Sequence, residues 1–160
     1  MANPAVKERA PAKKRTRYED DLYTWVQEQV ALLRAGRLDE VDAENVAEEL
    51  SDVGSEQYDK LESSVRVLVM HMLKWDQQPE KRSPSWVASI DEHRDRIAKL
   101  LRKNPGLKSR IEEAVRDSYG GAVRWASVET GLPRSEFPRE CPYAWDRILN
   151  RPFELDRDLS

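Results

Sequence analysis

The stretch that decides the fold reads VRVLVMHMLKW and covers residues 65–75. Before Lys74 its apolar side chains are interrupted only by Arg66 and His71, so a helix here is apolar almost all the way round. A helix of this kind needs neighbours on several sides. Its uncharged run, 67–73, is far shorter than the about 20 apolar residues that span a bilayer. We therefore expect this stretch to be the central helix of a soluble, all-helical domain.

Apolar positions continue upstream of this stretch at steps of three or four residues, which is the spacing of one face of an α-helix. The series starts at Val46, shortly after Asp42, whose carboxylate is suited to accept the free N–H groups of a first helical turn. We expect one long helix over 42–75 with its bend or break at Gly54. The alternative is two helices divided at Gly54, the second restarted by Ser55.

The same periodicity and clear start and stop residues predict the other helices. We expect helices at about 21–35, 84–103 and 105–130, and a short one that begins at Pro142. Gly120 and Gly121 interrupt the helix at 105–130, and they indicate a bend or the close approach of another helix. The predicted fold is all-α, an antiparallel helical bundle of about four long helices plus a short C-terminal helix.

The composition fits one globular domain with charged ends. Of the 160 residues, 36% are charged and 8% are aromatic. We expect a single helical-bundle domain over 18–150, a disordered basic tail over 1–17 and a C-terminal extension over 151–160. The tail has a net charge of +5, which leaves −8 on the other residues. Its basic residues are Lys7, Arg9, Lys13, Lys14, Arg15 and Arg17.

The single cysteine, Cys141, excludes an internal disulfide and a multi-cysteine zinc cluster. It stands before Pro142 at the start of the predicted short helix, and we expect a structural role for it rather than a catalytic one. The N-terminal residues contain no apolar stretch of the kind found in a signal peptide. Together these features predict a cytoplasmic protein.

Several short motifs resemble the bacterial Domain of Unknown Function 29 family, in the order in which that family carries them. The motifs are Tyr18-Glu19-Asp20-Asp21 ahead of Trp25 and Gln29, Leu32-Leu33-Arg34-Ala35-Gly36-Arg37, Asp42-Ala43-Glu44-Asn45 with Glu48-Glu49, His71-Met72-Leu73-Lys74-Trp75, Phe137-Pro138 and Cys141-Pro142-Tyr143. The resemblance covers nearly all of the chain after the basic tail. It implies an all-helical bacterial protein, and it implies no activity, cofactor or partner.

His71 and His93 are the only histidines. If the helices on either side of residues 77–82 form a hairpin, the two imidazoles lie about one helical turn apart, where they could bind a metal or share a proton. A stable metal site needs a third ligand, and neither helix offers a carboxylate three or four residues after its histidine. We therefore expect hydrogen-bonded core or boundary histidines, and we assign no metal, cofactor or catalytic residue.

Glu49 projects beside the apolar stripe of its helix, so its carboxylate needs a donor. We expect Arg or Lys on a neighbouring helix, or a second copy of the chain. A general base is the alternative, although no nucleophile accompanies it. The spacing of Trp75, Trp86 and Trp125 predicts aromatic core residues rather than a stacking platform for bases.

These observations predict a non-enzymatic helical interaction or assembly module that self-associates or binds a protein partner. The feature that favours this function is the apolar surface around the helix at residues 65–73. This surface is larger than a four-helix monomer is expected to cover. The alternative is a metal-dependent or acid/base enzyme centred on His71, His93 and a carboxylate such as Glu49 or Glu113. A weaker alternative is a nucleic-acid accessory protein that uses the basic tail.

Overall fold

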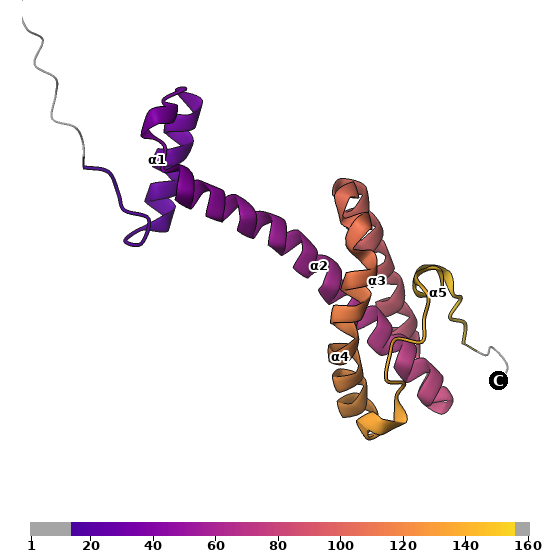
Figure 1. Ribbon diagram of the computed structural model, residues 1–160. Helices are drawn as coiled ribbons and strands as arrows, with labels where there is room; N and C mark the ends of the chain where they lie inside the picture. The colour runs from indigo at the N-terminus through magenta and orange to yellow at the C-terminus, as the bar shows by residue number, and fades with distance from the viewer. Residues whose placement is uncertain (1–13, 156–160) are drawn as a thin grey trace, which may run out of the picture. The chain divides into compact units, whose positions relative to one another are not determined.

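The computed structural model describes residues 14–155, and within that range it contains helices joined by loops and turns, with no strand. The parts of the predicted tail at 1–13 and of the predicted extension at 156–160 lie outside the described residues. The helices, coloured along the chain in Figure 1, are α1 (Leu22–Arg34), α2 (Ala43–Gln77), α3 (Pro84–Lys103), α4 (Ile111–Thr130) and α5 (Trp145–Asn150). Four long helices and one short helix confirm the predicted all-α fold class.

The chain divides into two compact units, Met1–Asp52 and Val53–Ser160. In its described part the first unit is a hairpin of α1 and the start of α2. The second unit contains the rest of α2 together with α3, α4 and α5. Within the described residues, no helix is both long enough and apolar enough to cross a membrane. The single domain expected over 18–150 stays a prediction.

α2 is one continuous helix of 35 residues, and it passes through Gly54 without a break. The one-helix expectation is confirmed. Asp42 caps its start, because the Asp42 carboxylate accepts a hydrogen bond from the backbone N–H of Asn45 at 3.4 Å. α1 is capped in the same way by Asp21, which accepts from the backbone N–H of Thr24 at 3.0 Å, and it is followed by Gly36 with a positive φ of 69°.

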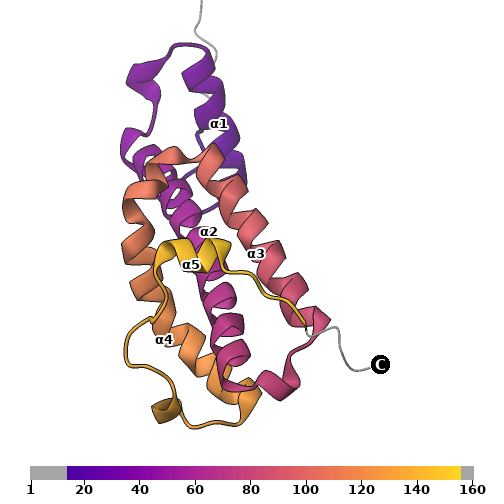
Figure 2. The same ribbon diagram turned by 90° about the vertical axis from the view of Figure 1, so that its right-hand side faces the viewer.

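In the second unit, most residues of α2 between Leu61 and Trp75 are buried, and the others in this range are half-buried. α3 and α4 cross α2 obliquely in Figure 1, and Figure 2 shows them on either side of it with α5 lying across it. The apolar side chains that cover it come from all three segments: Ile90, Ile97, Leu101, Ala114, Ala122, Ala126, Tyr143, Ile148 and Phe153. The expectation that residues 65–73 carry more apolar surface than the monomer covers is therefore wrong, because the C-terminal segment adds a third covering layer.

α4 starts at Ile111, after a 3₁₀ turn over Pro105–Arg110, and ends at Gly131 with a φ of 73°. The paired glycines lie inside it without ending it. A Cβ on Gly121 would stand 2.6 Å from Cδ of Arg66 on α2, whereas a Cβ on Gly120 would meet nothing within 4 Å. Of the two outcomes expected here, Gly121 shows the close approach of another helix.

The two ends of the described chain are attached to their units. Residues 151–155, assigned from the sequence to an extension, belong to the core of the second unit, because the ring of Phe153 packs edge-on against Trp75 with 5.2 Å between centroids. Residues 14–17, assigned to the tail, lie against the first unit. There the Arg15 side chain forms an ion pair with Glu40, and the Thr16 backbone N–H donates to Glu28 at 3.0 Å.

The paired glycines give a matched test of this packing. Gly120→Ala should raise the free energy of unfolding by up to about 1 kcal/mol, because alanine has the higher helix propensity and the position is open. Gly121→Ala should gain less or lose stability, because its Cβ displaces Arg66. Urea unfolding of both variants measures the difference, and equal effects would contradict the close approach.

Candidate functional site

Lys74 is the charged group most deeply placed in the second unit. Its α2 position faces inward and its side chain is buried. The Nζ atom forms an ion pair with the carboxylate of Glu129 on α4 and lies 4.3 Å from the ring centroid of Trp86 on α3. A cation above an indole face and beside a carboxylate is stabilised by both groups. One ammonium group thus connects three helices.

His71 lies one helical turn before Lys74, with its ring centroid 6.5 Å from that of Trp86. Burial is the main cause that lowers the pKa of His71 from 6.5 to about 4, and the positive charge of Lys74 adds to it. The imidazole is therefore neutral at physiological pH. Its Nδ1 atom is buried and has no hydrogen-bond partner among residues 14–155.

His93 on α3 has a similar environment, since burial lowers its pKa and its Nδ1 atom also has no hydrogen-bond partner in the described part of the chain. A positive charge on His93 would also lower the pKa of His71, but this is the smallest of the contributions. His93 lines a groove of about 780 Å³ between α2 and α3, and His71 is not among the residues that line that groove. The two histidines therefore do not share its solvent-reaching wall, as an acid/base pair would require.

Between residues 14 and 155, no group of three or more His, Cys, Asp and Glu side chains is arranged to hold a metal ion. Among the described residues, neither Glu49 nor Glu113 forms such a group with the histidines. Glu113 forms an ion pair with Arg110, with 2.5 Å between Nε and Oε2.

Glu49 accepts a hydrogen bond from the hydroxyl of Tyr18, with 2.7 Å between the oxygens. This bond is the main cause that raises the pKa of Tyr18 to about 12. The expected Arg or Lys donor is thus replaced by a phenol from the segment just before α1. This donor was not expected from the sequence, because Tyr18 precedes the first predicted helix.

A polar network fixes the rest of the first unit, and its centre is Asp42. The indole N–H of Trp25 donates to the Asp42 carboxylate at 3.3 Å, and the Asn45 side-chain amide donates to it at 2.7 Å. The buried side chain of Gln29 accepts from the Asp42 backbone N–H at 2.9 Å. A glutamine within the apolar stripe of α1 was the sequence signal for this role.

The three tryptophans named as aromatic core differ in their positions. Trp75 is buried and Trp86 is half-buried over Lys74. The core position expected for Trp125 is wrong, because 55% of its surface is exposed. The buried line of α4 passes through Ala114, Ser118, Ala122 and Ala126, and Trp125 lies about 100° away from Ala126 around the helix.

A second polar cluster, which the sequence analysis missed, attaches the C-terminal segment to α2. The Asp76 carboxylate accepts from the Tyr143 hydroxyl at 2.7 Å and from the Arg151 guanidinium at 2.6 and 3.0 Å. Burial alone would raise the pKa of Asp76, but these hydrogen bonds outweigh it and lower the pKa. The Arg94 guanidinium adds two bonds to backbone carbonyls, those of Ile148 and Arg151.

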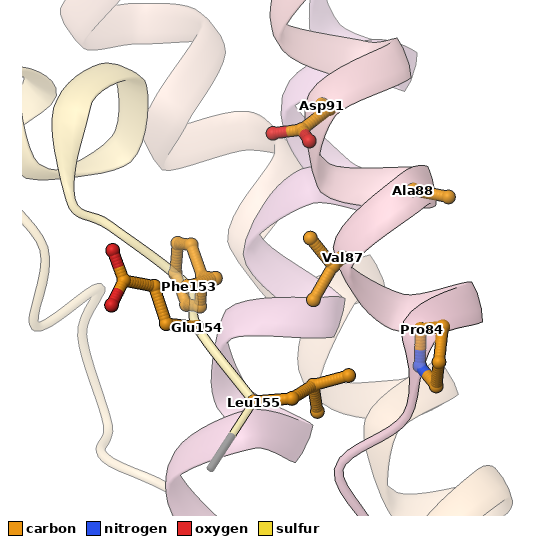
Figure 3. A pocket seen from close by; sticks show the side chains of 7 residues that line it. All are labelled: Pro84, Val87, Ala88, Asp91, Phe153, Glu154 and Leu155. Atoms are coloured by element: carbon orange, nitrogen blue, oxygen red, sulfur yellow. The ribbon is translucent and has the colours of Figure 1, made fainter. Parts of the chain in front are cut away.

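A pocket of about 930 Å³ lies beside this cluster, between the start of α3 and the C-terminal segment (Figure 3). Val87, Phe153 and Leu155 give it an apolar wall. Asp91 lies at one end, and Glu154 points its carboxylate away from Val87. The lining contains one inward-facing carboxylate and no second polar group of the kind that would orient a substrate.

Cys141 is half-buried, and burial raises the pKa of its thiol. α5 begins only at Trp145, so the thiol is not at the N-terminus of a helix, where its pKa would fall. The Sγ atom lies 3.7 Å from the carbonyl oxygen of Tyr143. These contacts fit the structural role expected for this residue.

The ion pair of Lys74 can be tested by a double-mutant cycle. Glu129→Gln should destabilise the protein by about 1–2 kcal/mol, because it leaves a buried ammonium without its carboxylate. The double variant Lys74→Met, Glu129→Gln should be more stable than Glu129→Gln alone, since it removes the unpaired charge. Chemical unfolding of the four proteins gives the coupling energy, and strictly additive changes would contradict the pairing.

The pKa of His71 predicts how stability depends on pH. Folding favours neutral His71, so this contribution is complete above about pH 6.5 and is lost as the pH falls towards 4. After allowance for partial solvent screening, the loss should be about 2 kcal/mol. His71→Leu should flatten the stability profile in this window, and an imidazole NMR titration midpoint near 6.5 would contradict the burial.

Comparison with known proteins identifies the family. No curated protein and no solved structure matches the chain. The family model described as "Domain of unknown function DUF29" matches residues 17–154 of the 160-residue chain. The chain therefore belongs to the DUF29 family.

Proposed function

We propose that this protein is a non-enzymatic helical interaction module and that its contact surface is the N-terminal hairpin of α1 and the start of α2. The observation that carries the proposal is the imbalance between buried and exposed apolar side chains in the first unit. Its buried side chains are Trp25, Gln29 and Leu32. Its exposed large apolar side chains are Leu22, Tyr23, Leu33, Leu38 and Leu50.

Size makes this imbalance important. The described part of the first unit comprises residues 14–52, and units of about 40 residues rarely bury enough surface to be stable without a disulfide, a metal or a partner. Its sequence contains no cysteine. An apolar side that stays open on so small a unit favours a protein partner that covers it.

The alternatives have less support. Tyr18 occupies the carboxylate of Glu49. Burial lowers the pKa of His71 to about 4, which makes it a weak base at neutral pH, so neither residue favours the acid/base enzyme considered from the sequence. For nucleic-acid binding through the tail, Arg15 already pairs with Glu40, and Arg17 lies 3.5 Å from Glu19. These contacts favour attachment of residues 14–17 to the hairpin.

Site-specific photo-cross-linking in the cells that produce the protein tests the proposal. A benzophenone amino acid placed at position 23 or 33 should give a discrete cross-linked protein, because both side chains are exposed on the hairpin. The same amino acid at position 128, an exposed valine site on α4, is the matched control and should give none. Identification of the product by mass spectrometry names the partner. No product from positions 23 and 33 at native expression levels would overturn the proposal.

A further inference from the structure

α1 has a wider apolar face than the hairpin covers. Successive residues of an α-helix are about 100° apart, which places Leu22, Val26, Val30 and Leu33 on one strip beside the buried line of Trp25 and Leu32. Leu22 is 47% exposed and Leu33 is 44% exposed, and the two valines between them are half-buried. This strip, called the open strip of α1 below, has no covering element among residues 14–52, the part of the first unit that the structure describes.

The first turns of α2 repeat this arrangement. Val46 is half-buried, and Glu49 turns towards Tyr18. Ala43, Ala47 and Leu50 form the adjacent strip and are exposed, Leu50 to 67%. α2 therefore also has apolar surface beside its packed side.

The segment before α1 covers the other side of the hairpin. The ring of Tyr18 packs edge-on against Trp25 at 4.9 Å between centroids, and its hydroxyl binds Glu49. Thr16 binds Glu28. Because α1 and the start of α2 are antiparallel, the positions around each helix place both exposed strips on the side away from Tyr18. The hairpin is closed on one side and open on the other.

The charges of α1 are self-complementary. Its N-terminus follows Glu19, Asp20 and Asp21, and its last residue is Arg34. Two α1 helices that cross antiparallel about a two-fold axis near their middle would place Leu22 of one copy opposite Leu33 of the other. The same symmetry places Arg34 of each copy beside the acidic start of its partner, so each contact occurs twice.

The distribution of charge also selects α1 over α2 as the contact helix. Residues 14–52 carry eleven carboxylates and five basic side chains, a net charge of −6. Seven of these carboxylates lie between residues 39 and 52, whereas α1 itself has only Glu28 and Arg34. Two copies of the α2 segment would repel each other, and two copies of α1 would not.

We infer that the open strip of α1 is covered by the open strip of α1 in a second copy of this chain, so that two hairpins form an antiparallel four-helix assembly. This inference rests on the proposed function and names its partner. The contact is isologous, with the apolar side chains of the strip in its centre and the Arg34–acidic contacts at both ends.

Sedimentation equilibrium and native mass spectrometry of the full chain test the inference. The wild-type protein should be a dimer at micromolar concentration. Leu22→Ser with Leu33→Ser should raise the dissociation constant at least about tenfold, because four leucine side chains leave the interface. Val128→Ser is the matched control, since it removes an exposed apolar side chain from the second unit and should leave the dimer unchanged. Circular dichroism of each variant verifies that helicity is kept.

A charge exchange tests the antiparallel geometry. Arg34→Glu should weaken the dimer, because it places a carboxylate beside the acidic start of the partner helix. Adding Asp20→Arg to this variant should restore dimerisation, since opposite charges again meet across the two-fold axis. Failure of the second substitution to restore the dimer would overturn the proposed register.

The outcomes separate this inference from the proposed function. A wild-type chain that stays monomeric up to about 100 μM would overturn the inference, as would a dimer unaffected by the leucine substitutions. If cross-linking from positions 23 and 33 then captured a different, identified protein, the interaction function would stand without self-association. Cross-linked products of twice the chain mass would support both.

Discussion

The burial of α2 between Leu61 and Trp75 is the constraint on which the second unit depends. A helix that is apolar almost all round cannot be covered by one neighbour, and α3 and α4 together still leave a side open. The C-terminal segment closes that side through Tyr143, Ile148 and Phe153. This requirement explains why a segment with only one short helix contributes buried side chains to the same core as the long helices.

The same burial determines how the charges of polar side chains near the end of α2 are compensated. The side chain of Lys74 is only 6% exposed, and its charge is balanced by Glu129 and by the face of Trp86. Asp76 is balanced by Arg151 and Tyr143 in a similar way. His71 has no such partner for its Nδ1 atom and loses its charge instead. Each solution follows from the cost of an unpaired charge away from water.

Most helix bounds could be predicted from the sequence because they depend on local chemistry. Asp21, Asp42 and Gly131 act on backbone groups within one turn, and their roles are visible in the chain itself. Contacts such as those of Lys74 with Glu129 or Asp76 with Arg151 join residues 55 and 75 positions apart. These contacts depend on how each helix is rotated about its axis relative to its neighbours. The apolar periodicity defines this rotation only to within about one residue, or about 100°. Trp125 was misplaced for this reason, and the Tyr18–Glu49 bond was missed because its donor precedes the first helix.

The first unit differs from the second, because its two helices are held together with few buried apolar side chains. Asp42 receives hydrogen bonds from Trp25 and Asn45 and gives its backbone N–H to Gln29, and Tyr18 closes the same side on Glu49. Such bonds define the angle and register of the hairpin more than they add to its stability. A hairpin with a fixed shape and an incomplete core presents its open apolar side in one arrangement. A partner that covers this side then loses less conformational entropy on binding than it would against a flexible segment, and this preorganisation is what an interaction surface on so small a unit requires.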